Sequence, residues 1–214
     1  IFFNFNYRYS SLCQLVKSSI ADGSIGSVVN ITGVLSHGLA FKEGYSNSWR
    51  GKYPINESVV LDTSLIHIID LCNYVLNEPL EIKCSSSKSF KHGRDSFFIG
   101  LETENKVNIS LFGSYAAPYC FSLQVLGTNG LIEAGDTSLV LKAPRDTFDE
   151  KGFFITPPEC ISNDYSFELD YQNSLQSAVN HFITHAISGE SFPIVDFDLS
   201  LETTQLVCDA QLSG

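Results

Sequence analysis

Large apolar residues recur at every second position in several parts of the chain, which is the spacing of β-strands. Residues 1–9 and 25–35 each place their large apolar side chains on one face of an extended chain, so we expect a strand in both. Between residues 80 and 142 the same pattern repeats in short segments separated by turns. This region predicts strand after strand, with a hairpin turn at Gly127-Thr128-Asn129-Gly130.

Other segments show the spacing of three to four residues that an amphipathic helix requires. The predicted helices cover residues 11–22, 64–76, 169–188 and 199–212. Ser10 or Ser11 can cap the first helix and Asp198 the last. Gly23 and Gly189 can end helices in the left-handed conformation. In the helix over 64–76 we expect a wide apolar face and an opposite polar face that carries His67, Asp70, Tyr74 and Asn77.

These elements predict an α+β fold, in which an open and mostly antiparallel sheet has its helices on one face. No Gly-x-Gly-x-x-Gly motif follows a strand, so we expect no nucleotide-binding half. The 214 residues suit one domain spanning 1–214. The chain contains no methionine and opens directly on a predicted strand, and we therefore expect it to be a piece of a longer protein.

Composition narrows the class of protein further. Hydrophobic residues make up 43% of the chain and charged residues 17%, which excludes a disordered chain. No run approaches 18 apolar residues, so we expect no membrane span. The net charge of −11 would repel DNA or RNA.

Six cysteines are present, without any Cys-x-x-Cys pair, and most lie in apolar segments where a free cysteine behaves as a small hydrophobe. This favours a reducing cytoplasm. Glycosylation sequons at Asn30, Asn56 and Asn108 point the other way, but such short motifs arise by chance in a chain rich in Asn and Ser.

The candidate chemistry lies between Leu61 and Leu71, where Asp62 and His67 meet at the junction of a loop and a helix. Histidine can exchange protons near neutral pH, and a nearby carboxylate fixes its tautomer and raises its basicity. Spacing alone favours a plainer interpretation, in which His67 is a half-buried helix residue and Asp62 or Thr63 is an N-cap.

Two further features could bind ligands. Residues 37–58 form a long irregular segment, in which Trp49 could stack on a sugar ring and Arg50 could bind a carboxylate or phosphate. The pair could equally anchor the segment on the sheet. His181 and His185 lie one helical turn apart, but no third ligand has matching spacing, so we expect no metal site.

The order of these segments resembles the C-terminal domain of the Gfo/Idh/MocA family of NAD(P)-dependent sugar and cyclitol oxidoreductases. The resemblance spans nearly the whole chain and rests on several motifs in order. These are Asn4 to Tyr9 with its Asn/Arg pair, Ile20 to Val28, Trp49-Arg50, Asp62 to Leu71 followed by Glu78-Pro79, Val125 to Ile132, and His181 to Glu190.

The resemblance implies a domain with helices and a substrate cleft on one face of the sheet and a dimer or tetramer interface on the other. It implies that His67 transfers a proton to or from a sugar hydroxyl and that Asp62 assists. Substrate-binding roles would fall to Asn6, Arg8, Trp49 and Arg50. NAD or NADP would act in the full-length parent, bound by a missing dinucleotide-binding domain, and this piece alone should bind no cofactor.

The chain also departs from the family pattern. Asp62 and His67 are five residues apart instead of four, which places them about 140° apart on a regular helix, so Asp62 must lie before that helix to face His67. The usual Gly triplet is replaced by Asn56-Glu57-Ser58. These departures keep open a non-catalytic regulator or scaffold on the same fold, as in the galactose-regulon repressors of yeasts. An unrelated α+β ligand-binding module is a third possibility.

Overall fold

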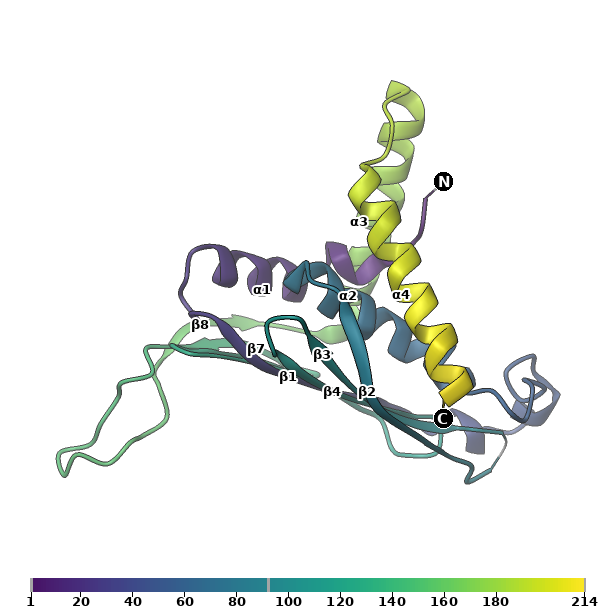
Figure 1. The fold of residues 1–214 in the computed structure, drawn as a ribbon, viewed down its shortest axis with the longest axis horizontal. Coiled ribbons are helices and arrows are strands. Elements are labelled where there is room, and N and C mark those ends of the chain that lie inside the picture. Colours follow the sequence, from purple (N-terminus) through teal and green to yellow (C-terminus); the bar gives the residue numbers. More distant parts are fainter. Residues whose placement is uncertain (1, 92, 214) are drawn as a thin grey trace.

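The computed structural model describes residues 2–91 and 93–213. Within this part of the chain, eight strands form one open sheet in the order β2-β3-β4-β1-β5-β6-β7-β8 (Figure 1). The strands are β1 (Val28–Ser36), β2 (Leu80–Lys88), β3 (Ser96–Thr103), β4 (Asn108–Ser114), β5 (Cys120–Gly127), β6 (Leu131–Ala134), β7 (Ser138–Lys142) and β8 (Glu159–Asp164). Neighbouring strands are antiparallel except for β1 and β4, which run parallel. The predicted open, mostly antiparallel sheet is confirmed.

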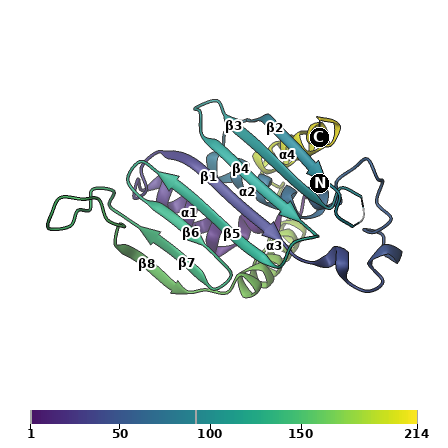
Figure 2. The ribbon, with the colours of Figure 1, turned by 90° about the horizontal axis from the view of Figure 1, so that it is seen from below.

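The helices lie on one face of this sheet, and the opposite face is bare (Figure 2). They are α1 (Ser11–Ala21), α2 (Ile66–Leu76), α3 (Phe167–Ser188) and α4 (Ile194–Ser213), with short helical turns at η1 (Asn6–Tyr9), η2 (Leu39–Phe41), η3 (Tyr45–Asn47) and the π-helical η4 (Leu61–Leu65). In Figure 1, α1 and α2 lie along the sheet, whereas α3 and part of α4 rise away from it. No helix among the described residues is long and apolar enough to cross a membrane.

Two glycines let η4 and α2 sit directly on the centre of the sheet. A Cβ atom at Gly113 of β4 would lie 2.7 Å from Cγ of Leu65, and one at Gly33 of β1 would lie 2.8 Å from a methyl carbon of Leu111. The absence of these Cβ atoms allows Leu65 and Ile68 to pack against the strands, where both are fully buried. This packing fixes the position of the residues around them, including His67.

The predicted strand over residues 1–9 is wrong within the described residues 2–9. Residues 2–5 are irregular, and Asn6–Tyr9 form the 3₁₀ turn η1 beside α3 and α2. The alternation of aromatic and polar residues gave a wrong prediction because the polar residues are also buried. Asn6 binds Ser174 and Arg8 binds Asp70. Both faces of this segment therefore bond or pack against helices, and no neighbouring strand pairs with it.

Details of other elements also differ from expectation. The strand predicted over 25–35 begins at Val28, and a register shift between Val28 and Asn30 turns Val29 outward, so its side chain is 47% exposed. The last helix begins at Ile194, which places Asp198 inside the helix instead of at its cap. Cys13 and Cys72 are buried as expected of small hydrophobes, but the other four cysteines are exposed.

The predicted end signals of α1 and α3 are confirmed. The Ser10 hydroxyl caps α1 by accepting a hydrogen bond from the Cys13 backbone amide. Gly23, just beyond α1, and Gly189, at the end of α3, adopt positive φ values of 74° and 72°. The glycines thus end these helices where the sequence indicated.

Candidate functional site

A cavity of about 360 Å³ lies beyond the C-terminal ends of the parallel strands β1 and β4. Its walls come from η1, the segment after β1, η4, the start of α2, the segment after β4, and the start of α3. The lining residues are Tyr7, Leu35, His37, Leu39, Arg50, Thr63, Ser64, His67, Tyr115, Tyr119, Phe167 and Tyr171. Hydroxyl, imidazole and guanidinium groups therefore line the same cavity as several aromatic rings.

His67 projects from the first turn of α2 between two aromatic rings. Its ring centroid lies 5.4 Å from that of Tyr7 and 6.0 Å from that of Phe5. Its Nδ1 atom is buried and has no hydrogen-bond partner in the described structure. Burial lowers the pKa of His67 below its ordinary value of 6.5, so the ring is neutral at pH 7. A neutral imidazole can accept a proton.

Arg50 brings a positive charge to the lining of the cavity. Its guanidinium carbon lies 4.3 Å from the centroid of the Trp49 ring, and its buried Nε has no hydrogen-bond acceptor among the described residues. Burial, reinforced by the charge of Arg50, lowers the pKa of His37 as well. The Nε donor therefore carries the cost of an unmade hydrogen bond, while the guanidinium group of Arg50 lines the cavity.

His37 and Tyr115 lie side by side because each follows the last residue of a strand in the parallel pair. Ser36 of β1 is paired with Ser114 of β4, and the two rings that follow stack with centroids 4.5 Å apart. The Tyr115 hydroxyl is within hydrogen-bond distance of the hydroxyls of Thr63 and Ser64. These hydroxyls can donate to or accept from a polyhydroxylated ligand.

Comparison with known proteins shows the family to which this chain belongs. The family model of the GFO/IDH/MocA C-terminal domain matches residues 13–133, which is 121 of the 214 residues. The chain belongs to the Gfo/Idh/MocA family. No curated protein matches the sequence significantly.

Solved structures share the fold of this Gfo/Idh/MocA domain. A protein from Desulfitobacterium hafniense assigned as an NADPH-dependent oxidoreductase matches 99% of the chain and 62% of its own, at 19% identity and a TM-score of 0.75. Levoglucosan dehydrogenase, complexed with NADH and levoglucosan, matches 98% of the chain and 64% of its own, at 18% identity and a TM-score of 0.71. Myo-inositol 2-dehydrogenase from Lactobacillus plantarum matches 98% and 61%, at 16% identity and a TM-score of 0.69. The chain therefore spans a little over three fifths of the length of these structures.

The segment that carries Asp62 is not a regular α-helix. Asp62 lies in the π-helical η4, whose turns close between residues five apart, and η4 directly precedes the helix α2 that carries His67. The Asp62 carboxylate accepts a hydrogen bond from the Tyr53 hydroxyl, and burial together with that bond raises the pKa of Tyr53. No hydrogen bond joins Asp62 to His67 among the described residues.

The structure brings His67 and Arg50 to the cavity but leaves the other candidates outside its lining. Asn6 donates to Ser174 Oγ at 2.8 Å, and Arg8 forms a buried ion pair with Asp70. Trp49 is 56% exposed beside Arg50. The polar groups of Asn6 and Arg8 are thus engaged in holding η1 against α3 and α2.

The prediction that Asp70 lies on a polar outer face of α2 is wrong. Asp70 is completely buried, because α4 and η1 cover this side of the helix. His37, Tyr115 and Tyr119 are cavity residues to which sequence analysis gave no role. His37 and Tyr115 could have been found together only from the parallel pairing of β1 with β4. The described residues hold no group of three or more His, Cys, Asp or Glu side chains that could bind a metal.

Proposed function

We propose that this chain is the substrate-binding domain of an NAD(P)-dependent oxidoreductase that acts on a hydroxyl of a sugar, nucleotide sugar or cyclitol. The observation that carries the proposal is His67, an imidazole that burial keeps neutral at pH 7 and that lines the same cavity as several hydroxyl groups. The similar folds of levoglucosan dehydrogenase and myo-inositol 2-dehydrogenase support this substrate class.

In this proposal His67 handles the proton of the reacting hydroxyl. When the alcohol is oxidised, the imidazole accepts the hydroxyl proton, and when the carbonyl is reduced, the imidazolium returns it. Arg50 would bind a substrate oxygen through its guanidinium group, and the hydroxyls of Thr63 and Tyr115 would orient further hydroxyl groups. Asp62 would act only indirectly, since Tyr53 occupies its carboxylate.

The cofactor would be held outside this chain. NAD(P) supplies the hydride acceptor or donor when bound, but the described residues do not fit its phosphates, because no described strand runs through a short glycine-rich turn into a helix.

A missing dinucleotide-binding domain would also cover an apolar surface on α3. Val179, Phe182 and Ile183 are each about half exposed there, and Ile187 is 81% exposed.

The bare face of the sheet would form a homodimer or homotetramer interface. Phe112 of β4 and Leu126 of β5, the two strands that flank β1, are more than a third exposed. An apolar patch on an uncovered sheet is typical of an interface between copies of a chain.

A non-catalytic regulator on the same fold is the second candidate. The engagement of Asp62 by Tyr53, in place of His67, favours it. Such a protein would bind the sugar in the same cavity without turning it over.

The test is turnover by the full-length protein. Reduced nicotinamide formation is followed with levoglucosan, myo-inositol and related polyols, in the presence of NAD or NADP. We expect turnover of at least one polyol and a fall of at least ~10-fold in kcat/KM for Arg50→Met, from the loss of a charged hydrogen bond. The control is Arg145→Met, which lies outside the cavity. Polyol binding without any turnover would support the regulator.

A further inference from the structure

The charges that line the cavity around His67 are unbalanced. Arg50 is one of the described residues that line it, and none of these residues is an Asp or a Glu. An arginine side chain stays protonated in proteins, so the lining carries a positive charge without a carboxylate. The chain as a whole has a net charge of −11, and this local excess is therefore opposite in sign to the rest of the protein.

The Arg50 side chain has no anionic partner among the described residues, whereas the buried Arg8 pairs with Asp70. The contact that holds Arg50 is with the Trp49 ring, whose centroid lies 4.3 Å from the guanidinium carbon. A guanidinium group that lies over a ring keeps its N–H donors in its own plane, where a carboxylate can accept two parallel hydrogen bonds. Arg50 is thus positioned in the cavity wall without its charge being used.

Three carboxylates bond to groups around the cavity, but none of them belongs to its lining. Asp62 accepts a hydrogen bond from the Tyr53 hydroxyl. Asp136 accepts one from the Tyr119 hydroxyl at 2.9 Å. Asp170 accepts from backbone amides at the start of α1. The lining itself therefore offers a ligand the charge of Arg50 and several hydroxyl groups, with these carboxylates outside it.

A single positive charge suits a carboxylate better than a phosphate. Burial, together with the charge of Arg50, lowers the pKa of His37, and burial lowers the pKa of His67, so both rings are neutral at pH 7. A carboxylate carries one negative charge, whereas a phosphate monoester carries nearly two at this pH. The volume of about 360 Å³ lies at the lower end of the range of ligand sites and suits a single sugar ring.

The groups between Arg50 and His67 form one continuous wall. The charge of Arg50 acts on His37, whose ring stacks on that of Tyr115 with centroids 4.5 Å apart. The Tyr115 hydroxyl lies 3.1 Å from the Ser64 hydroxyl, and His67 follows Ser64 by three residues, which is about one helical turn. A ligand held at one end of this wall by Arg50 can therefore present hydroxyl groups along the rest of it.

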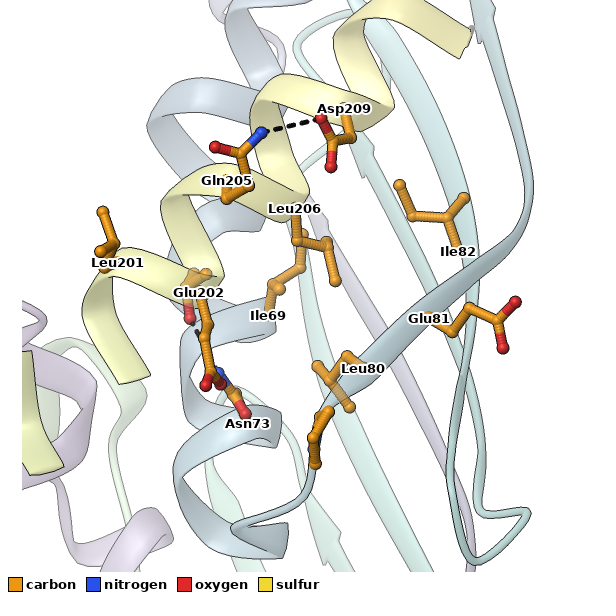
Figure 3. Close-up of a pocket in the computed structure, with 12 residues that line it drawn as sticks. Ile69, Asn73, Leu80, Glu81, Ile82, Leu201, Glu202, Gln205, Leu206 and Asp209 are labelled. Atoms are coloured by element: carbon orange, nitrogen blue, oxygen red, sulfur yellow. Dashed lines mark hydrogen bonds between the residues drawn. The ribbon is translucent and has the colours of Figure 1, made fainter. Parts of the chain in front are cut away.

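The larger cavity of the described structure has the opposite charge. It has a volume of about 710 Å³, lies between α2, α4 and the edge strand β2, and shares no lining residue with the cavity around His67 (Figure 3). Its lining includes Glu81, Glu202 and Asp209, and no lining residue is basic. Electrostatics therefore directs an anionic ligand to the smaller cavity, and we expect one binding site per chain.

We propose that the substrate of the cavity around His67 is a sugar acid, whose carboxylate binds the guanidinium group of Arg50. Its ring hydroxyls lie along Tyr115 and Thr63, and the reacting hydroxyl faces His67. This inference rests on the proposed function in taking the cavity as the substrate site. A neutral polyol leaves the charge of Arg50 unused, and a sugar phosphate finds no second positive charge in the lining.

The test is calorimetric titration of the full-length protein with D-glucuronate and D-galacturonate, each compared with its uncharged amide. The amide keeps the size of the ligand and removes only its charge. We expect at least one acid to bind at least ~10-fold more tightly than its amide, because charged hydrogen bonds are the strong ones. We also expect D-glucose 6-phosphate to bind more weakly than that acid.

Variants of Arg50 assign the preference to this residue. In Arg50→Met the acid and its amide should bind within about twofold of each other, since the cation is gone. Arg50→Lys keeps the charge without the planar fork and should retain part of the preference. The matched control is Arg145→Met, which removes an exposed arginine outside the cavity and should keep the full preference.

The outcomes separate this inference from the proposed function. Equal affinities of acid and amide in the wild type, an unchanged preference in Arg50→Met, or no measurable binding of either acid would overturn the assignment to a sugar acid. Tighter binding of the sugar phosphate would overturn it in favour of a phosphorylated sugar. Arg50-dependent binding of the acid without turnover would support this inference and contradict the dehydrogenase function, whereas turnover of neutral polyols without any preference for acids would do the reverse.

Discussion

The buried ion pair of Arg8 and Asp70 holds η1 against α2, and its removal should sharply destabilise the domain. The guanidinium donates from Nε to Asp70 Oδ2 at 2.8 Å and from Nη2 to Oδ1 at 2.5 Å. Arg8 is 7% exposed and Asp70 is completely buried. Burial raises the pKa of Asp70, while the bonds from Arg8 oppose that rise.

Replacing Arg8 by Met leaves the Asp70 carboxyl group in the interior without its main partner. Breaking a buried pair in this way costs about 3–5 kcal/mol. With a urea dependence of about 2 kcal/mol/M, a loss of about 4 kcal/mol lowers the unfolding midpoint by about 2 M. Urea unfolding followed by circular dichroism measures this shift directly.

Two further variants separate the buried charge from lost packing. Arg8→Met/Asp70→Leu removes both charges and should recover stability to within about 1 kcal/mol of the wild type, because a buried pair is often replaceable by apolar residues. Arg145→Met, which removes an exposed arginine bound to Asp146, should leave the midpoint unchanged. A wild-type midpoint for Arg8→Met, with a raised KM for substrate, would refute this reasoning and restore Arg8 to the substrate-binding role implied by the family resemblance.

Three more outcomes are expected. Gly113→Val should destabilise the fold by about 1–3 kcal/mol, because its Cβ would lie 2.7 Å from Leu65 Cγ; equal thermal midpoints for this variant and the wild type would contradict the packing described. For alcohol oxidation, kcat/KM should decline on the acid side only below pH 6.5, because burial lowers the pKa of His67 and protonation below that pKa removes the proton acceptor. A decline that begins above pH 7 would exclude His67 as the proton acceptor. Phe112→Asp should shift an oligomer toward monomer in light scattering, and an unchanged mass would show that the bare sheet face is not the interface.

The sequence predicted the strands best where one face of the sheet is covered by helices. Phe97, Ile99 and Leu101 alternate in the sequence, and all three are buried in β3 under the helical layer. The apolar stripe of α2 was likewise readable, since Leu65, Ile68 and Ile69 must face the sheet. In these elements the local period and the tertiary environment require the same residues.

Prediction failed where distant segments decide what is buried. Asp70 looked like a solvent-facing residue because the covering helix α4 lies more than 120 residues further along the chain. Residues 2–9 alternate like a strand, yet the partners of Asn6 and Arg8 lie on helices. Val29 turns outward because of a β-bulge that the local sequence does not predict.

The candidate site was predictable in part. His67 was selected from its neighbourhood of a carboxylate and an apolar helix, and it lines the cavity together with Arg50. The expected partnership with His67 required Asp62 to lie before the helix that carries His67. Asp62 does lie before α2, in the π-helical turn η4, but its carboxylate bonds to Tyr53. His37 and Tyr115 depend on the parallel pairing of two strands about 80 residues apart, which periodicity does not reveal.

The central claim is that His67 transfers the substrate proton, and the most direct test is the kcat of His67→Gln in the full-length protein. Glutamine keeps the size and hydrogen bonding of the side chain but cannot accept a proton near pH 7, so kcat should fall by at least ~100-fold while the unfolding midpoint is retained. His185→Gln, on α3 outside the cavity, is the matched control and should keep the wild-type kcat. A near-normal kcat in folded His67→Gln would show that His67 is a structural residue of α2 and would contradict the proposed mechanism.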